Sequence, residues 1–568
     1  NPGESSQLRI TIGNTEGWQS ATDLTATLTS DNPGVTIIDG NAVYGDIFPG
    51  GIQINISDVF EFELSDAIDL GEVEFNIDLS TTDASGEAYT QSVSFSIIVS
   101  LNQDGWPLDM LSEELYNVET SPVVIDSNDD GEMEIYFGDY SGNVYAVNAD
   151  GEEIVNALFP FNTGDQIWGS PAAADIDNDG NIEIIVTSKS KHLFVLDPVN
   201  QTVDLDYYAV QFLMGTPVIA NIDDDNDLEI IVGGFSSPAK IFAINADGSD
   251  VPGFPFELGE KMIKGLAVAD FNDNGKVDIV AGTENYNIYL INDDATIAPG
   301  FPYLTGNKIR SAPAIAETES GKLILSGSRD NNFYGLNADG SLRFSVLTGD
   351  YVVNSPAFME TESGLAIFFG SLDGNLYGID VDGNPLAGWP ISHSGSITGS
   401  PVIADLNGDG QAEIVCGTQS AEVVAYNLDG TSFSYFPIFN DFGFAGTPTI
   451  TDTDGDLDLE ILIGSTGNLA NIDFKDEGNS DDYWSLFHGN LKRTGYYTSE
   501  PINDCSGCSL GDVNCDGTID VLDIVRAVYI IMNDPPDADE CERIRADFNE
   551  DGVLDVLDLV MLVNEIMN

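Results

Sequence analysis

Acidic loops of one pattern recur along the middle of the chain, and the spacing of their side-chain oxygens is suited to holding a metal ion. In six loops, Asp, Asn or Glu occupies positions 1, 3, 5 and 9, and most of these loops have a glycine at or near position 6. Alternate residues of a tight loop point to one side, and glycine permits the sharp turn. The candidate ligands are Asp126, Asn128, Asp130, Glu134; Asp175, Asp177, Asp179, Glu183; Asn221, Asp223, Asp225, Glu229; Asp270, Asn272, Asn274, Asp278; Asp405, Asn407, Asp409, Glu413; and Asp452, Asp454, Asp456, Glu460.

Calcium is the ion that this pattern favours. It takes about six to eight hard oxygen ligands in a flexible cage, whereas magnesium requires a stricter octahedron and keeps several waters. A single match would suit a solvated acidic turn equally well, but six matches in register within one repeat favour metal binding. The corresponding loops at residues 317–321 and 360–364 are shortened, so we do not expect them to form the same cage.

The loops belong to a repeat that is marked by a Ser/Thr-Pro phrase. Equivalent positions lie 43 to 49 residues apart, and an eighth copy around Leu266 lacks the proline. Each repeat contains a short apolar strand, the acidic loop, two further strands, and a turn followed by an aromatic-Pro pair. The phrase occurs at Ser121-Pro122, Ser170-Pro171, Thr216-Pro217, Ala312-Pro313 (where Ala replaces Ser/Thr), Ser355-Pro356, Ser400-Pro401 and Thr447-Pro448.

Short strands separated by Asp-Gly and Asn-Gly turns, with no helical period between them, predict one β-propeller blade per repeat. Eight repeats imply eight blades, with seven as the alternative if one copy is an embellishment. The rival architecture is an open β-solenoid, whose repeats would be shorter. We expect residues 483–487, which follow the last repeat, to close the ring with the strand near Trp106.

The C-terminal residues carry a second kind of acidic loop, which occurs twice with an offset of 35 residues. Each copy has a glycine at position 6 and runs into an apolar helix, the first through Met532 and the second through Met567. Position 12 is Asp instead of the bidentate Glu of a full EF-hand. The candidate ligands are Asp512, Asn514, Asp516, Asp520 and Asp523, then Asp547, Asn549, Asp551, Asp555 and Asp558.

Two loop–helix units without entering helices resemble a type I dockerin over residues 511–568. The resemblance implies a calcium-folded module that binds a cohesin, which is a β-sandwich. In that family, positions 10 and 11 of each loop often carry Ser or Thr and help to select the cohesin, but here they are Val521-Leu522 and Val556-Leu557. These apolar pairs either belong to the module's core or form a patch that binds an unusual partner.

Residues 102 to 500 resemble the FG-GAP repeats of integrin-type propellers, and the aromatic-Pro phrases are similar to those of quinoprotein-like propellers. Residues 1–101 lack the repeat, and their apolar residues alternate with period two, which predicts an Ig-like β-sandwich. We therefore expect a mainly β chain with four parts. These are a sandwich (1–101), a calcium-binding propeller (102–500), a linker (501–510) and a small helical dockerin-like EF-hand pair (511–568).

The charge balance limits the partners. The chain has 96 acidic and 18 basic residues, which excludes nucleic acid as a natural partner because phosphate contacts require Lys and Arg. No run of eighteen apolar residues occurs, so we expect no membrane insertion. The N-terminus has neither a basic nor an apolar signal segment, and we expect a trimmed chain from an extracellular or cell-surface protein of bacterial type.

The cysteines support an oxidising compartment. Cys505, Cys508, Cys515 and Cys541 cluster near the C-terminus and suggest one or two disulfides, with their pairing open, while Cys416 stands alone in an apolar strand. A zinc site would need a second cysteine pair at metal spacing, and Cys515 and Cys541 do not supply it.

Catalysis has little support in the sequence. None of the three histidines, His192, His393 and His488, lies in a nucleophile or metal-ligand motif. We therefore predict a secreted, non-enzymatic binding or assembly protein that holds about eight calcium ions, six in the repeats and two in the C-terminal module. Its partner would be a cohesin-like sandwich or the N-terminal sandwich of another copy, and a polysaccharide is a further candidate. The alternative is a polysaccharide lyase or hydrolase on a calcium propeller, for which Lys261, Lys264, Lys308 and Arg310 form the most basic patch.

Overall fold

The computed structural model describes residues 2–65, 67–83, 85–103, 105–109, 117–128, 130–223, 225, 227–481 and 483–498. It also describes short C-terminal stretches at 513, 519, 521–533, 545–546, 559 and 561–563. Contacts divide the chain into two units, Asn1–Tyr497 and Thr498–Asn568. The first unit consists of β-strands, as the sequence predicts, and the helix with defined bounds lies in the second.

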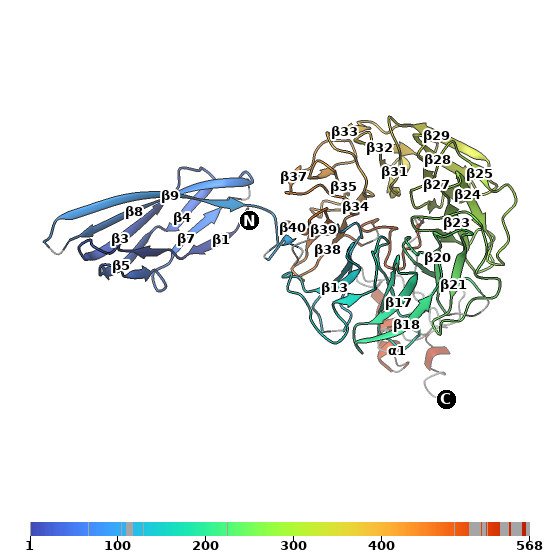
Figure 1. Cartoon of the computed structure of the whole chain (residues 1–568), viewed down its shortest axis with the longest axis horizontal. Coiled ribbons are helices and arrows are strands. Elements are labelled where there is room, and N and C mark those ends of the chain that lie inside the picture. Colours follow the sequence, from blue (N-terminus) through green and yellow to red (C-terminus); the bar gives the residue numbers. More distant parts are fainter. Residues whose placement is uncertain are drawn as a thin grey trace. The chain divides into compact units, whose positions relative to one another are not determined.

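The N-terminal strands form sheets with the orders β1-β7-β4, β5-β3-β8-β9 and β2-β6 (Figure 1). Their bounds are β1 (Ser5–Leu8), β2 (Thr11–Gly13), β3 (Ala21–Thr29), β4 (Val35–Asp39), β5 (Asn41–Ile47), β6 (Ile52–Ile54), β7 (Phe60–Leu64), β8 (Gly71–Thr82) and β9 (Ala88–Val99). Strand β3 shows the expected alternation, because Leu24, Ala26 and Leu28 are buried between exposed residues. The two larger sheets share one core, in which the rings of Phe62 and Phe75 lie 4.9 Å apart.

Eight further sheets of three to five strands follow one another around a ring (Figure 1). We number these ring sheets one to eight in chain order. Sheets one to four contain β11 (Val123–Ile125), β12 (Glu134–Gly138), β13 (Asn143–Val147), β14 (Phe161–Asn162); β15 (Ala172–Ala174), β16 (Glu183–Thr187), β17 (His192–Asp197), β18 (Thr202–Tyr208); β19 (Val218–Ala220), β20 (Glu229–Gly233), β21 (Ile241–Ile244); and β22 (Ala267–Ala269), β23 (Asp278–Gly282), β24 (Asn287–Ile291), β25 (Tyr303–Leu304).

Sheets five to eight complete the ring, which has a propeller-like arrangement. They contain β26 (Ala314–Ala316), β27 (Leu323–Gly327), β28 (Asn332–Asn337), β29 (Leu342–Leu347), β41 (Tyr496–Tyr497); β30 (Ala357–Thr361), β31 (Gly364–Gly370), β32 (Asn375–Asp380), β33 (Ile391–Ser392); β34 (Val402–Ala404), β35 (Glu413–Gly417), β36 (Glu422–Tyr426), β37 (Ile438–Phe439); and β38 (Thr449–Thr451), β39 (Asp458–Gly464), β40 (Asn468–Glu477), β10 (Leu108–Asp109). Apolar side chains pack between neighbouring sheets, as where the rings of Phe333 and Phe369 stack at 3.9 Å.

The Ser/Thr-Pro phrase joins successive sheets near their first strands. The backbone N–H of Ser121 donates to Ser170 Oγ, and that of Ser170 donates to Thr216 Oγ1, each at 2.9 Å. The same bonds run from Ser355 to Ser400 and from Ser400 to Thr447, again at 2.9 Å. In these four phrases, the hydroxyl of Ser170, Thr216, Ser400 or Thr447 therefore satisfies a buried backbone donor of the preceding sheet, which explains the preference for Ser or Thr there.

The ring closes differently from our expectation for residues 483–487, although a strand near Trp106 does take part. Leu108–Asp109 (β10) pairs antiparallel with β40, and so the start of the ring completes the sheet formed by its end. Closure through β40 removes an open sheet edge, which a propeller must avoid. The prediction that residues 483–487 form this closure is wrong.

Residues 484–497 instead run along the first strands of the sheets. The backbone N–H groups of first-strand residues in six sheets donate to carbonyl oxygens of this segment at 2.8 to 3.0 Å; they belong to Ile403, Ile450, Ala173, Ile219, Val268 and Ile315. Arg493 is fully buried and donates to the carbonyl oxygens of Pro171, Phe487, Ser121 and Pro122 at 2.8 to 3.2 Å. We call residues 484–497 the central segment, because it bonds to sheets on opposite sides of the ring.

The second unit contains α1 (Val521–Asn533), whose Ala527 and Ile530 pack with Val513, Ala546 and Leu562 in a small core. Arg545 donates to the carbonyl oxygen of Val513 at 3.3 Å. The helix lies where the first apolar run was predicted. Among the described residues, no helix has the length and apolar character needed to cross a membrane.

Candidate metal centres

Each of the six acidic loops joins the first strand of a ring sheet to the second. Position 1 directly follows the first strand, as Asp175 follows β15, and position 9 lies in the second strand, as Glu183 begins β16. The loop therefore turns back between two paired strands. This fixes the distance between its first and last ligand positions, and the same register recurs in sheets one, two, three, four, seven and eight.

The loop at 175–183 shows how the oxygens are held. The Asp175 carboxylate accepts from the backbone N–H of Asp179 at 3.2 Å and of Gly180 at 3.1 Å, which closes the turn. Glu183 Oε2 accepts from the N–H of Ile176 at 2.9 Å. The other oxygen, Glu183 Oε1, is buried without a hydrogen-bond partner, and ligand atoms of Asp175, Asp177 and Glu183 lie within 4.8 Å of one another.

Two further loops repeat this arrangement. Glu229 and Glu460 each accept one backbone N–H, at 2.8 and 2.5 Å, and each keeps a second, buried oxygen without a partner. In these loops Asp223 and Asp225 cluster with Glu229, and Asp452 and Asp454 cluster with Glu460. An unpartnered buried carboxylate oxygen is costly unless a cation neutralises it, and so these donor sets fit a hard cation such as calcium.

The other three loops have Asn at position 3. Its amide nitrogen faces the position-9 carboxylate, at 2.8 Å between Asn128 and Glu134 and at 3.4 Å between Asn272 and Asp278. In the third loop, Asp405 accepts the N–H of Gly410 at 2.8 Å and Glu413 accepts that of Leu406 at 2.9 Å. The turn is therefore the same, and rotating an Asn amide would present its oxygen in place of its nitrogen.

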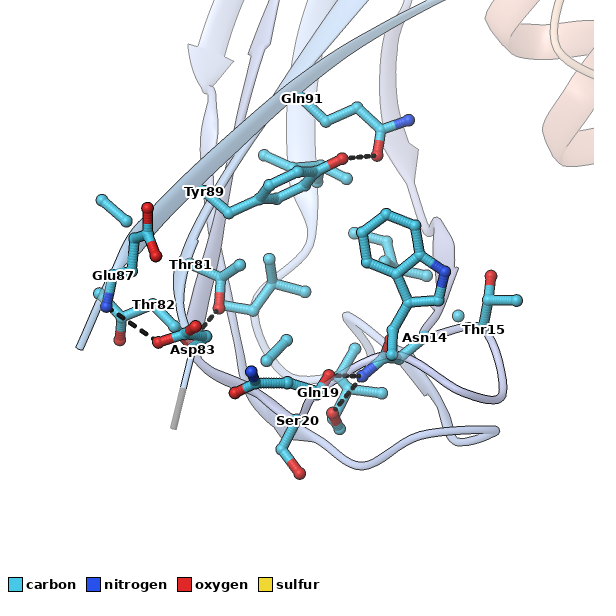
Figure 2. Close-up of a pocket in the computed structure, with 18 residues that line it drawn as sticks. Asn14, Thr15, Gln19, Ser20, Thr81, Thr82, Asp83, Glu87, Tyr89 and Gln91 are labelled. Carbon is cyan, nitrogen blue, oxygen red and sulfur yellow. Dashed lines mark hydrogen bonds between the residues drawn. The ribbon is translucent and has the colours of Figure 1, made fainter. Parts of the chain in front are cut away.

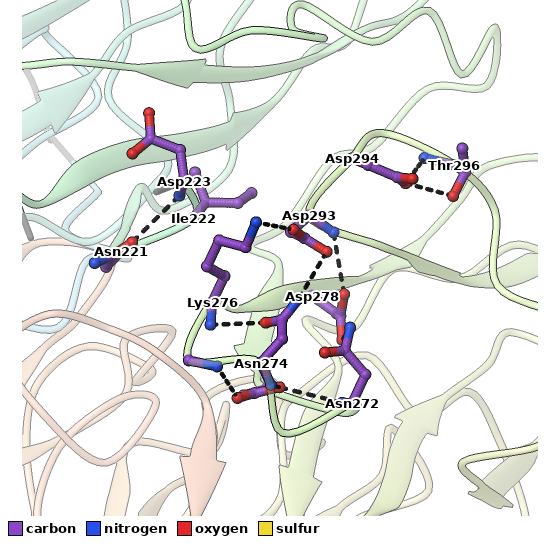
Figure 3. Close-up of polar contacts among 12 residues, drawn as sticks. Asn221, Ile222, Asp223, Asn272, Asn274, Lys276, Asp278, Asp293, Asp294 and Thr296 are labelled. Atoms are coloured by element: carbon purple, nitrogen blue, oxygen red, sulfur yellow. Dashed lines mark hydrogen bonds and ion pairs between the residues drawn. The ribbon is translucent and has the colours of Figure 1, made fainter. Parts of the chain in front are cut away.

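Figure 3 shows the loop at 270–278 beside its neighbours. Lys276 forms an ion pair with Asp293 at 2.7 Å, and Asp278 Oδ1 accepts from the backbone N–H of Asp293 at 3.0 Å. Asn274 Oδ1 accepts from the N–H of Lys276 at 2.9 Å. The side chains of Asn272, Asn274 and Asp278 come together as the sequence predicts, with a lysine outside the donor set.

Burial makes five of the position-9 carboxyls, those of Glu183, Glu229, Asp278, Glu413 and Glu460, reluctant to ionise without a cation. Burial first, and then nearby loop carboxylates, raise the pKa of Glu183 to about 8 and those of Glu229, Glu413 and Glu460 to about 7. The pKa of Asp278 rises to about 6 for the same reasons. A bound divalent cation would reverse this effect, since it stabilises the charged form.

The loop of sheet eight contains acids that the sequence pattern missed. Ligand atoms of Asp456, Asp458 and Glu460 also lie within 4.8 Å of one another, and Asp473 on β40 is buried nearby. Lys475 contacts Asp473 at 2.5 Å and Asp458 at 4.0 Å. Asp458 stands at position 7 of the loop, where a backbone oxygen is the usual ligand. The sequence feature that could have identified it is the extra acid in the alternating run Asp454-Gly455-Asp456-Leu457-Asp458.

The two shortened loops are simple turns. The hydroxyls of Thr318 and Thr361 donate to the carbonyl oxygens of Gly321 and Gly364, both at 2.6 Å. In the part of the chain that the structure describes, no metal-type cluster occurs at either turn. These sheets therefore provide internal controls for the six acidic loops.

The predicted C-terminal ligands lie outside the residues whose side chains the structure describes. They are Asp512, Asn514, Asp516, Asp520, Asp523, Asp547, Asn549, Asp551, Asp555 and Asp558, and the apolar pairs Val521-Leu522 and Val556-Leu557 fall in the same category. Cys505, Cys508, Cys515 and Cys541 are also outside it, whereas Cys416 is a buried free thiol. These predictions rest on the sequence.

The histidines do not form a catalytic set. His192 contacts Asp206, His393 Nε2 lies 3.4 Å from the Tyr426 hydroxyl, and His488 Nδ1 lies 3.1 Å from the carbonyl oxygen of Arg493. None of these partners is a serine or cysteine nucleophile. The three rings lie in different ring sheets or in the central segment.

The N-terminal strands enclose a hollow of about 510 Å³ (Figure 2). Trp18 and Tyr89 line it and remain 66% and 49% exposed. Amides and carboxylates complete the lining, with Asn14 donating to the carbonyl oxygen of Gln19 at 2.8 Å and Asp83 accepting from the N–H of Glu87 at 2.9 Å. The acidic residues of this lining are Asp83 and Glu87.

Comparison with known families agrees with two of the resemblances. Residues 510–567 match the dockerin type I domain. Residues 126–186, which include the first two acidic loops, match the FG-GAP-like repeat. Dockerin domains bind calcium, and both modules are typical of extracellular or cell-surface proteins. No curated protein sequence matches the chain.

Solved structures resemble the chain at low sequence identity. The V. cholerae biofilm matrix protein Bap1 is 13% identical, with a TM-score of 0.51 over 68% of this chain and 94% of Bap1. BamB from Moraxella catarrhalis is 15% identical, with a TM-score of 0.43 over 62% of this chain and 99% of BamB. At these identities the likeness to Bap1 concerns the fold, and we base no argument on BamB.

Proposed function

We propose that the chain is a secreted, non-enzymatic protein of bacterial type that binds or assembles extracellular partners in a calcium-dependent way. The observation that carries this proposal is the dockerin type I match at residues 510–567, because a dockerin implies a cohesin partner. The six acidic loops support calcium dependence, since three of them hold a buried carboxylate oxygen without a partner. Bap1 is described as a biofilm matrix protein, and an extracellular structural role would agree with that description.

We further propose that the eight ring sheets are eight propeller blades (102–500) and that the N-terminal sheets (1–101) form an Ig-like sandwich. The closure of sheet eight by β10 supports a complete ring of eight. Residues 501–510 would link the propeller to the dockerin-like module at 511–568. Six loop ions and two module ions give about eight calcium ions per chain.

The partner is a cohesin-like sandwich, and the proposal includes one special case. Because cohesins are β-sandwiches, the dockerin-like end of one chain could engage the N-terminal sandwich of another. Such a head-to-tail contact does not close on itself and would build a filament. The hydrophobic pair Val521-Leu522 and its equivalent Val556-Leu557 would then form the contact.

Binding of the intact chain to a panel of type I cohesins tests this proposal by biolayer interferometry. We expect binding in calcium that is lost with chelator and in the double variant Asp516→Ala/Asp551→Ala, whereas Glu362→Gln in a shortened loop leaves it unchanged. Sedimentation velocity in calcium tests head-to-tail self-assembly, for which we expect species larger than a monomer. Absence of both cohesin binding and self-association would overturn the proposal, and so would release of unsaturated products from polygalacturonate.

A further inference from the structure

The basic residues of the ring divide into two groups by their partners. Most of those near the acidic loops pair with acids, as Lys322 does with Glu317 and Arg343 with Asp382, both at 3.1 Å. Among the described residues, six cations of the ring outside the central segment form no ion pair, although the chain has 96 acidic residues. They are Lys189, Lys191, Lys240, Lys261, Lys264 and Arg329, which we call the unpaired cations.

Strand order places the unpaired cations on one face of the ring. Consecutive strands are antiparallel, so the loops after first strands lie at one face and the loops after second and last strands lie at the other. The acidic loops are of the first kind. The unpaired cations belong to the second kind. Lys189 and Lys191 lie between β16 and β17, Lys240 between β20 and β21, and Arg329 between β27 and β28. In sheet three, Phe256 bridges antiparallel to Ile241 of β21 and takes the place of a fourth strand, so Lys261 and Lys264, which follow Phe256, lie at the same face.

Backbone hydrogen bonds hold these loops together. The N–H of Lys189 donates to the carbonyl oxygen of Gln166 at 3.0 Å, and the N–H of Arg329 donates to that of Lys308 at 2.9 Å. The N–H of Glu284 donates to the carbonyl oxygen of Lys261 at 2.9 Å. Loops of successive sheets therefore form a fixed surface, and the cations stand on a rigid base.

Aromatic rings lie beneath three of the cations. Lys191 Nζ lies 5.3 Å from the ring centroid of Phe212, Lys261 Nζ lies 5.1 Å from that of Phe235, and Arg329 Cζ lies 4.4 Å from that of Tyr351. Cation–π contacts hold the side chains along the surface without neutralising their charge. On the same face, Tyr208 at the end of β18 and Tyr286 between β23 and β24 are 54% and 40% exposed.

Lys308 and Arg310 extend the cationic region into sheet five. They share a single acid, Glu284, at 2.5 and 2.6 Å, which leaves one net positive charge. At the inner end of the face, a hollow of about 30 Å³ is lined by Trp168, Lys264 and Asn354 among other residues. That volume holds about one water molecule and no sugar ring. A ligand would therefore lie across the face instead of entering the centre.

We propose that this face, over sheets two to five, binds an acidic polysaccharide. The unpaired cations would receive uronate carboxylates, and the exposed tyrosines would stack on the apolar faces of sugar rings. The net charge of −78 repels a polyanion at long range, but exposed charges beyond about 10 Å are screened at physiological salt. Binding is therefore decided by the charges of this face, where loops of the same kind also carry the acids Asp165, Glu260, Asp330 and Asp350 beside the unpaired cations. A polymer with spaced carboxylates and pyranose faces fits this surface better than a nucleic acid, which carries a phosphate on every residue.

Affinity electrophoresis with hyaluronan, a uronate polymer that calcium does not gel, tests the inference on the intact chain. We expect retardation by hyaluronan that weakens with added salt, and none by neutral dextran. The variant Lys261→Gln/Arg329→Gln should bind about tenfold more weakly. Its matched control, Lys322→Gln/Arg343→Gln, removes two cations from the opposite face and should bind as the wild type does.

The hyaluronan experiment and the cohesin experiment can fail independently of each other. The inference is overturned if hyaluronan does not retard the chain, if dextran retards it equally, if single-stranded DNA competes more strongly, or if the control variant loses binding to the same extent. Equal melting temperatures check that both variants fold, and Lys189→Gln/Lys191→Gln provides a second pair on the same face. The Asp516→Ala/Asp551→Ala variant should still bind hyaluronan, because the surface belongs to the ring.

Discussion

His488 is a buried titratable ring whose surroundings predict a clear response to acid. It is fully buried, its Nδ1 donates to the carbonyl oxygen of Arg493 at 3.1 Å, and its Nε2 has no partner. Burial, with a smaller contribution from the nearby Arg493 charge, lowers the pKa of His488 from 6.5 to about 4. The ring is therefore neutral in the folded chain at physiological pH.

We expect His488 to make the folded ring less stable as the pH falls from 6.5 to about 4. In this window the unfolded chain binds a proton that the folded chain does not, and the effect ends below the folded pKa, with a total of about 3 kcal/mol. Melting temperatures in saturating calcium measure it. His488→Gln, which keeps a donor for Arg493, should show a shallower fall between these pH values, and an equal slope in both proteins would contradict the assignment.

Glu183 tests a single acidic loop. In calcium, Glu183→Gln should lower the stability by about 2–3 kcal/mol, because a bound ion stabilises the fold by mass action. With chelator, the same variant should be as stable as the wild type or more so, since the metal-free wild-type Glu183 must either take up a proton or keep a buried charge, and the neutral amide avoids both costs. Calorimetry under both conditions checks this change of sign. Glu362→Gln in a shortened loop is the control and should change neither value.

At the scale of single residues, much of the site could be predicted and some of it could not. The alternating positions of Asp175, Asp177 and Glu183 identify their loop, because a tight turn between two strands fixes which side chains converge. Arg493 and Asp473 do not belong to any alternating pattern of this kind in the sequence. Three of the four carbonyl acceptors of Arg493 come from two segments that are distant in the sequence, and Asp473 meets its partners only when β40 pairs with β39.

At the scale of elements, the central segment is the feature on which the ring's stability should depend most. Arg493→Ala would leave four carbonyl oxygens without their buried donor, and we expect a loss on the order of 3–5 kcal/mol. Arg493→Lys should recover part of this, since one ammonium cannot reach all four acceptors. Calorimetric unfolding of the ring measures the loss, and a change below about 1 kcal/mol would show that the segment does not clamp the sheets.

The sequence repeat predicts the strands of the ring, but it does not predict how the ring closes. Period-two patterns and turns define four strands in most of the repeats, and the structure places those strands side by side in chain order. Strand β10 has two residues, Leu108–Asp109, and is too short to show any pattern. The central segment also lacks a period, because its backbone groups bond to six different sheets instead of to one neighbouring strand.

At the scale of the whole molecule, the proposed calcium-bearing ring is followed along the chain by a module that matches a dockerin. Eight calcium ions would add 16 positive charges to a formal net charge of −78, leaving −62. The remaining charge is spread over a surface whose basic residues are few, and six of them gather without acidic partners on one face. A chain of this kind should work in a salty or calcium-rich exterior, where screening limits its self-repulsion.

The number of calcium ions held by the intact chain is the most direct test of the central claim. After gel filtration in calcium, metal analysis by inductively coupled plasma mass spectrometry should give about eight ions per chain, and one fewer in Glu183→Gln. The double variant Asp516→Ala/Asp551→Ala should retain about six. Two ions or fewer in the wild-type chain would show that the ring loops are solvated acidic turns, and would contradict a calcium-bearing ring.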